Sequence, residues 1–201
     1  MFGDPVTNPM GWPIYELGDI SSSRLGKMLD GKQQTGKSRF PYLANYNVQW
    51  FHFDLSELHE MDFSEADQRE FELKDGDLMV CEGGEIGRCA IWHNQITPCF
   101  FQKAVHRIRC DGRLILPEYL SFWFYEYAQE HGFDDIAGSK TTIAHLPGVK
   151  LKKLDVIVPP LDRQRAFVSL LESTDKSKFA LQQNMERLEM CRNALMQKAF
   201  G

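Results

Sequence analysis

Hydrophobic positions follow two different periods along the chain. Between residues 1 and 158, short runs rich in Val, Ile and Phe alternate with turns that contain Gly, Pro, Asn and Asp. Between residues 162 and 200 there is no Gly or Pro, and apolar residues recur at alternating steps of four and three. Short β-branched and aromatic runs indicate strands, whereas the four-three spacing indicates a helix with one apolar face. The sequence therefore predicts a mixed α+β body followed by a long helix.

The two parts meet at a pair of prolines. The run Val156–Val158 stops at Pro159 and Pro160, and proline has no N–H group to donate to a sheet. Asp162 follows, and an aspartate at this position can accept hydrogen bonds from the free N–H groups of a first helical turn. We therefore expect a body over residues 1–158 and a helical arm over residues 159–201.

Residue types and spacing also predict the elements of the body. Ser64 with Asp67 and Gln68 has the pattern of a helix start. The polar residues 21–41 are expected to form one long loop, and loops of this length in a compact domain are usually functional or disordered. Helices are predicted over residues 54–72 and 117–131, a short strand or turn over 14–20, and strands over 48–53, 78–81, 89–92, 99–104 paired with 105–109, and 151–158.

A run of glycines separates two of the predicted strands. Gly83, Gly84 and Gly87 lie between the apolar segments 78–81 and 89–92. No helix follows this run, so it is too weak a signal for a nucleotide-binding loop. We expect a structural turn in which at least one glycine has a positive φ.

The arm carries an apolar seam with polar interruptions at Thr174, Lys178 and Arg192. Such interruptions tend to fix the register and the number of partner helices in a coiled coil. Roughly 38 residues at about 1.5 Å each give an arm of roughly 57 Å, which exposes too much apolar surface to stand alone. We expect a partner helix to cover the seam, and the alternative is that the arm folds back onto its own body. The seam consists of Phe167, Leu171, Leu181, Met185, Leu188 and Leu195.

Composition places the chain among soluble proteins. Hydrophobic residues make up 43% of the 201 residues, and no apolar run approaches the roughly 18 residues that a membrane-spanning helix needs. The N-terminus has no basic and apolar signal region, so we expect a cytoplasmic protein without membrane contact. The five cysteines include no CxxC pair, which favours buried free thiols in a reducing compartment.

The net charge and the distribution of charge along the chain lead to different expectations about nucleic acid. A net charge of −5 argues against nucleic acid, because phosphate contacts require Lys and Arg. However, residues 24–39 contain five basic residues and one acid, whereas residues 54–77 contain ten acids and two basic residues. The body is therefore electrically polarised along the sequence. The alternative is that both segments are ordinary solvated loops.

No catalytic or metal-binding constellation emerges. The spacings of Cys81, Cys89, Cys99, His93 and His106 match no zinc pattern. A metal-dependent nuclease would need clustered carboxylates, and the acids near the glycine run (Asp77, Glu82 and Glu85) are better explained by a tight turn between strands. The sequence predicts neither a catalytic residue nor a metal ligand, so a binding protein becomes the favoured class.

The order of several motifs along the chain resembles one known family. They are Trp12 with Leu17–Ile20, Gly76–Leu78 with Glu82–Arg88, Phe101–Arg107, Gly138–Leu146, Pro159–Leu161 with Gln164, and Leu195–Phe200. In this order and spacing they resemble the DNA-specificity (S) subunits of type I restriction–modification systems over nearly the whole chain. Those proteins repeat a target-recognition domain and a long helix twice, whereas this chain has one of each. It would be either a natural half-subunit or a fragment.

The resemblance implies a fold and a set of partners. The fold would be α+β, with an irregular, partly β-helix-like recognition domain followed by a coiled-coil-type helix. The chain would have no enzymatic activity and no cofactor. Methyltransferase (M) subunits would methylate DNA with S-adenosylmethionine, and an ATP- and Mg-dependent restriction (R) subunit would cleave it. A coiled-coil adaptor that binds only protein is the alternative function.

Two interfaces follow from these expectations. We expect double-stranded DNA to contact basic and small polar side chains that converge on the side of the body opposite the acidic run. We also expect two copies to pair through residues 162–200, which would give an interrupted target with inverted halves. The expected DNA contacts are Arg24, Lys27, Lys32, Lys37, Arg39, Arg88, Lys103, Arg107, Lys140, Thr141 and Thr142.

Overall fold

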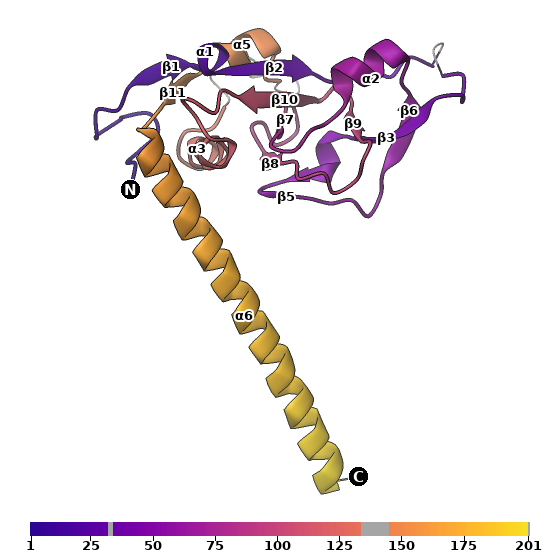
Figure 1. Cartoon of the computed structure of the whole chain (residues 1–201), viewed down its shortest axis with the longest axis vertical. Helices are drawn as coiled ribbons and strands as arrows, with labels where there is room; N and C mark the ends of the chain where they lie inside the picture. Colours follow the sequence, from indigo (N-terminus) through magenta and orange to yellow (C-terminus); the bar gives the residue numbers. More distant parts are fainter. Residues whose placement is uncertain (32–33, 134–144, 201) are drawn as a thin grey trace. The chain divides into compact units, whose positions relative to one another are not determined.

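A computed structural model describes residues 1–31, 34–133 and 145–200 of the chain (Figure 1). These residues form two compact units, a body over Met1–Leu161 and an arm that begins at Asp162. The body contains helices and strands and the arm is a single helix, so the predicted α+β class is confirmed. None of the helices within the described ranges is both long enough and apolar enough to span a membrane.

The body is built around a four-stranded antiparallel sheet in the order β2-β10-β7-β8. Successive side chains of a strand point to opposite faces, and β7 uses both faces. Leu78 and Val80 join one hydrophobic core, whereas Met79 and Cys81 join a second core. Burial on both faces explains why β7 is apolar at every position. The strands are β2 (Ser21–Leu25), β7 (Leu78–Cys81), β8 (Cys89–Ile91) and β10 (Val105–Cys110).

The first core lies toward the end of the body that carries α1, α5 and the β1–β11 pair (Figure 1). Helix α3 begins at a proline and buries Tyr119, Leu120, Trp123 and Phe124, which are spaced so that they share one face. The Tyr119 hydroxyl donates to the carbonyl of Ile157 at 2.7 Å and so joins α3 to β11. The elements are β1 (Ile14–Glu16), α1 (Leu17–Ile20), α3 (Pro117–Glu130), α5 (Gly148–Lys152) and β11 (Asp155–Ile157).

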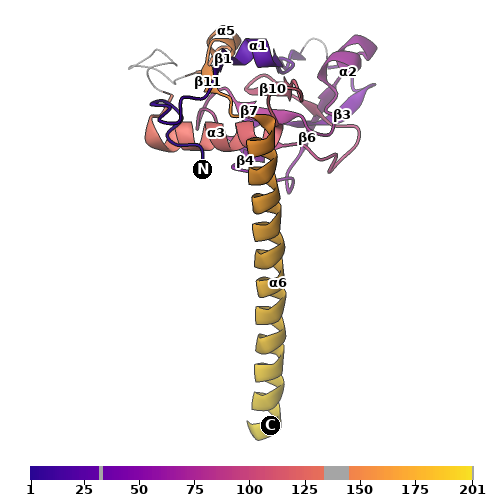
Figure 2. The same cartoon turned by 60° about the vertical axis from the view of Figure 1, so that its left-hand side comes forward.

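The second core lies toward the other end, under a three-stranded sheet of order β6-β3-β9 and helix α2 (Figures 1 and 2). The Ser64 hydroxyl accepts from the Asp67 N–H at 3.2 Å, and the Asp67 carboxylate accepts from the Ser64 N–H at 2.9 Å. This capping box confirms the predicted helix start. The elements are β3 (Arg39–Leu43), η2 (Asn45–Asn47), β4 (Val48–Gln49), β5 (His52–Phe53), β6 (His59–Asp62), α2 (Glu65–Phe71) and β9 (Phe100–Phe101).

Five predictions of local structure were wrong. Residues 54–72 are not one helix, because segment 59–62 is strand β6, paired with β3, and the helix α2 covers only Glu65–Phe71. Residues 21–41 are not one loop, because the Ser-rich segment 21–25 becomes strand β2 by pairing with β10. Segment 48–53 is a hairpin of β4 and β5, and segment 151–158 is the end of α5 followed by β11. Strand β9 pairs with β3 rather than with the segment that follows it. In each case a partner distant in sequence, or a turn, overrides local propensity.

The expected β-helix character is also not observed. A β-helix stacks parallel strands, and within the described ranges β3–β9 is the one parallel ladder between named strands. The other ladders are antiparallel and form small separate sheets.

Helix α6 (Leu161–Phe200) has 40 residues, which correspond to about 60 Å at about 1.5 Å per residue. Four of the predicted seam residues are strongly exposed: Leu181 (64%), Met185 (58%), Leu188 (70%) and Leu195 (67%). Phe167 and Leu171 are half-buried. The side chains of Leu181, Met185, Leu188 and Leu195 are therefore open to a partner.

Candidate nucleic-acid interface

Two segments distant in sequence meet beside strand β2. The Lys27 N–H donates to the carbonyl of Phe101 at 3.1 Å, and the Lys103 N–H donates to the carbonyl of Lys27 at 2.8 Å. A Cβ on Gly26 would lie 2.3 Å from the carbonyl oxygen of Gln102, so only glycine allows this approach. The start of the 26–38 loop is thereby fixed against the turn between β9 and β10.

This junction places three residues with a predicted DNA contact, Arg24, Lys27 and Lys103, around one hollow. Arg24 and Lys103 both line a depression of about 620 Å³ between β2, α2 and the β9–β10 turn. Asp67 and Glu70 of α2 line it as well. We call this the cationic hollow, although its lining also includes acids.

The exposed cations of the region differ in their partners. Arg24 forms an ion pair with Glu70 at 2.8 Å, and Arg39 pairs with Glu60 at 3.5 Å. Lys37 and Lys103 are exposed, and in the described part of the chain neither has a carboxylate at ion-pair distance. Lys37 and Lys103 are thus the cations most available to an outside phosphate.

The structure contradicts the expectation that the basic segment and the acidic run lie on opposite sides. Arg24, Lys27 and Arg39 form ion pairs with Glu70, Asp67 and Glu60 of the acidic run. The cause is topological, because β3 pairs with β6 and places Arg39 opposite Asp62. The interface predicted here is therefore an interleaved surface of both signs.

Lys27 does not belong to a DNA-contacting surface. It is 8% exposed, and its ammonium donates to the Asp62 carbonyl at 2.8 Å and to the Asp67 carboxylate at 2.6 Å. The ammonium also lies 5.2 Å from the centre of the Phe63 ring. These internal partners satisfy the charge, so the DNA-contact prediction for Lys27 was wrong.

Arg107 and Arg88 are also occupied within the body. Arg107 donates to the carbonyl of Glu70 at 2.8 Å at the C-terminal end of α2, where a cation is favoured. Burial lowers the pKa of Arg107, and the nearby Arg109 lowers it further. Arg88 donates to the carbonyl of Asn45 at 2.9 Å and to a carboxylate at 3.1 Å, and its side chain is 16% exposed. Both arginines therefore have partners within the body, and their predicted DNA contacts stay predictions.

Four of the predicted contacts lie outside the described residues: Lys32, Lys140, Thr141 and Thr142. They stay predictions from the sequence.

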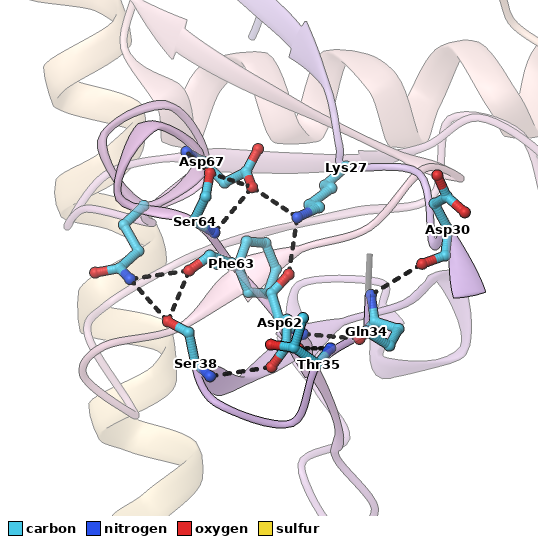
Figure 3. Close-up of polar contacts among 10 residues, drawn as sticks. Lys27, Asp30, Gln34, Thr35, Ser38, Asp62, Phe63, Ser64 and Asp67 are labelled. Carbon is cyan, nitrogen blue, oxygen red and sulfur yellow. Dashed lines mark hydrogen bonds and ion pairs between the residues drawn. The ribbon is translucent and has the colours of Figure 1, made fainter. Parts of the chain in front are cut away.

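A buried carboxylate that the sequence did not single out organises the loop that carries Lys37 (Figure 3). Asp62 is 5% exposed. Its carboxylate accepts from the N–H groups of Thr35, Gly36 (2.6 Å) and Ser38 (3.1 Å), and from the Thr35 hydroxyl (3.0 Å). In the sequence Asp62 was one of ten acids in a run, and nothing local distinguished it.

We call these contacts the Asp62 network. Burial would raise the pKa of the Asp62 carboxyl, but the N–H groups of Ser38 and Gly36 and the contacts with Thr35 outweigh burial and hold the pKa below its ordinary value. The carboxylate is therefore charged at neutral pH and fixed in place by donors.

The glycine run forms the expected turn. Gly84 and Gly87 have φ values of +76° and +84°, which confirms the prediction of a positive φ. A Cβ on Gly87 would lie 2.2 Å from the Phe133 ring, whereas the nearest atom to a Cβ on Gly84 is 3.5 Å away. Gly87 is thus required by packing as well as by backbone conformation.

The carboxylates considered for a nuclease are held separately. Asp77 is 2% exposed and receives two hydrogen bonds from Arg109, at 2.6 and 3.0 Å. Glu85 accepts from the indole N–H of Trp50 at 2.6 Å. Among the residues that the structure describes, no group of three or more His, Cys, Asp or Glu side chains could hold a metal ion.

Comparison with known proteins decides the family. Residues 9–189 match the type I restriction modification DNA specificity domain. The chain belongs to this family. A protein of Haemophilus influenzae named as a type I restriction enzyme specificity subunit is 27% identical over 194 residues, covering 91% of this chain and 47% of that protein. The MjaX specificity subunit of Methanocaldococcus jannaschii is 23% identical over 196 residues, covering 96% of this chain and 46% of that protein.

Solved structures share the fold of this specificity-domain chain. A chain from a structure on the assembly and conformational transition of the type I R-M system has a TM-score of 0.62 at 16% identity, covering 94% of this chain and 45% of that chain. The HsdS subunit of Thermoanaerobacter tengcongensis has a TM-score of 0.59 at 15% identity, covering 84% and 38%. The specificity-domain chain spans about half the length of the curated relatives that it matches.

Proposed function

We propose that the chain is a DNA-reading part of a type I restriction–modification specificity subunit. The observation that carries the proposal is the match to the DNA specificity domain over residues 9–189. The cationic hollow and the adjoining loop supply a surface for this role. Arg24 and Lys103 line the hollow, and Arg39 lies opposite Asp62, whose carbonyl is held by Lys27 of the hollow. The chain would not itself catalyse methylation or cleavage.

The DNA contacts would come from the exposed cations of this surface. Arg24, Lys37, Arg39 and Lys103 would neutralise phosphates, and Arg24 and Arg39 would exchange their carboxylate partners for them. Each phosphate neutralised adds about −0.9 to the slope of log affinity against log salt. Four contacts would thus give a slope of about −4. The net negative charge of the body does not prevent this slope, because the slope depends on the local cations that contact phosphates.

The arm would pair two copies of the chain as a coiled coil. The seam residues Leu181, Met185, Leu188 and Leu195 are exposed and need a cover. An antiparallel pair about a two-fold axis brings the same surface of each copy together and places one body at each end. With partial overlap of helices of about 60 Å, the bodies would lie one to two DNA turns apart at about 34 Å per turn. Each body would read one half of an interrupted, inverted target.

The remaining chemistry would belong to other subunits. Methyltransferase subunits using S-adenosylmethionine would dock on the outer faces of the paired arms, and a restriction subunit using ATP and Mg would join them. The chain would hold no cofactor of its own.

Binding of a mixed-sequence 40-bp duplex, followed by fluorescence anisotropy over a salt series, tests the proposal. We expect Lys37→Ala with Arg39→Ala to weaken binding and to flatten the slope by about 2. Lys74→Ala with Arg113→Ala removes the same charge elsewhere on the surface and should leave the slope unchanged. Absence of salt-dependent binding by the wild-type chain would instead favour an adaptor that binds only protein.

A further inference from the structure

The Asp62 network uses backbone donors that a DNA phosphate could otherwise have used. Successive N–H groups around a residue with positive φ form a concave anion site. Here Gly36 has a φ of +75°, and the N–H groups of Thr35, Gly36 and Ser38 all donate to the Asp62 carboxylate. Figure 3 shows the contacts of Thr35 and Ser38. The anion site is therefore filled by the protein itself, and its effect is to fix the backbone.

A second set of contacts ties the same segment to neighbouring elements. The Ser38 hydroxyl donates to the carbonyl of Phe63 at 2.8 Å, and the Gln68 side chain donates to the Ser38 hydroxyl at 3.2 Å. Lys27 holds the Asp62 carbonyl from the opposite side. The segment 35–38 is thus joined to β6 and α2 by side chains that are themselves anchored.

Lys37 is the exposed residue between two anchored ones. The N–H groups on either side of it, those of Gly36 and Ser38, donate to Asp62, while its own side chain is exposed. Arg39 follows at the start of β3, directly opposite Asp62 in the ladder. Asp62 therefore fixes the backbone from which both cations extend.

We propose that Asp62 is a positioning residue that gives sequence selectivity to the DNA contacts of Lys37 and Arg39. The inference rests on the proposed DNA-reading function. Attraction to any duplex requires only cations near phosphates, and mobile side chains supply it equally well. Reading a particular site requires a fixed register on the duplex, which phosphate contacts provide only when their backbone is fixed. Loss of the network should therefore reduce selectivity more than affinity.

Two variants remove the network by different means. Asp62→Asn removes the charge and two of the lone-pair directions that accept the N–H groups, at nearly unchanged volume. Gly36→Ala leaves the net charge unchanged, and a Cβ there meets no atom within 4 Å, so it acts only through the positive φ.

Each variant has a matched control. Asp54→Asn makes the same change at an aspartate that accepts from the N–H and hydroxyl of Ser56, outside the loop. Gly31→Ala is in the same loop, without a positive φ and with no atom within 4 Å of the added Cβ.

Selection from a library of 40-bp duplexes with a random core first identifies the DNA sequence that the wild-type chain prefers, and this duplex is the probe. The wild-type chain, with its arm, is used to enrich a sequence, and affinities for the enriched duplex and for a shuffled duplex are then measured for every variant. We expect Asp62→Asn and Gly36→Ala to lower the ratio of these affinities about tenfold, the cost of about one misread base pair, with little change for the shuffled duplex. Amide exchange at Thr35, Gly36 and Ser38 should accelerate in Asp62→Asn, whereas both controls should match the wild type.

Three outcomes would overturn the inference. One is an unchanged affinity ratio in both variants while the amides exchange faster. Another is an equal loss for both duplexes together with a lowered midpoint of unfolding, which would mean that Asp62 only stabilises the fold. A gain for both duplexes in Asp62→Asn would mean that the freed N–H groups bind phosphate. If the wild type enriches no sequence at all, the proposed function fails as well, so the two failures are distinguishable.

Discussion

The same substitution at Lys27 and at Lys37 tests two different roles of a lysine. Lys27→Met and Lys37→Met each remove one positive charge and retain an unbranched side chain of similar length. The ammonium of Lys27 is buried and bound to the Asp67 carboxylate at 2.6 Å, whereas Lys37 is exposed. The structure therefore predicts a loss of stability for the first variant and a loss of DNA binding for the second.

The magnitude follows from the contacts of Lys27. A hydrogen bond to a charged group contributes about 1.5–3 kcal/mol. The Asp67 side chain remains 24% exposed and can recover some hydration, so the lower part of this range applies. Methionine keeps an unbranched side chain of similar length but loses the contact of the ammonium with the Phe63 ring. We expect Lys27→Met to lower the free energy of unfolding by about 2 kcal/mol, and Lys37→Met to change it by less than about 0.5 kcal/mol.

Urea unfolding followed by tryptophan fluorescence measures the difference. All four tryptophans lie before residue 161, so the signal reports the body and not the arm. In DNA binding, Lys37→Met should reduce the salt slope by about 0.9. If Lys27→Met kept wild-type stability and reduced the salt slope by the same amount, the Lys27 ammonium would face DNA and would not be an internal contact.

Three further predictions concern other parts of the chain. Gly87→Ala should lower the free energy of unfolding by about 2–4 kcal/mol, because φ is positive and the new methyl group would lie 2.2 Å from the Phe133 ring. Gly84→Ala should lower it by only about 1 kcal/mol, and equal effects of the two variants in urea unfolding would contradict the packing argument. Leu188→Asp should make the chain monomeric in analytical ultracentrifugation at 20 °C, whereas Met190→Asp, at an exposed position off the seam, should leave it paired. A wild-type chain that is monomeric at tens of micromolar would exclude the paired arm. Cys191 should be the first thiol to react with a disulfide reagent at pH 8, because it is exposed, whereas burial raises the pKa of the buried thiols of the body. Rapid reaction of more than one thiol in the native chain would contradict the described core.

Structure determined by nearby residues could be predicted from the sequence. The start of α2 at Ser64 depends on Asp67 three residues away, and α3 and α6 follow from apolar spacing within a few turns. Strand β2 could not be predicted, because its Ser-rich sequence has no strand signal and its partner β10 lies 80 residues away or more.

The same distinction applies to the candidate site. Exposed lysines such as Lys37 and Lys103 in polar turns are predictable, since solvation is their default state. Lys27 has the same local context, but its burial depends on Asp62 and Asp67, which are 35 and 40 residues away. Charge composition therefore indicated a candidate region but could not separate the cations that contact solvent from those that hold the fold together.

Mapping of methylated adenines shows whether this chain directs DNA recognition. The chain is expressed with the type I methyltransferase subunit of the same cells in a host that lacks adenine methylation, and the genome is sequenced with base-modification detection. We expect methylation at one interrupted motif with inverted halves, which disappears without the chain and becomes degenerate in the Lys37→Ala, Arg39→Ala variant. Methylation that is absent, or that is the same with and without the chain, would contradict the claim that this chain reads DNA, and a motif with unrelated halves would contradict the pairing of two identical copies.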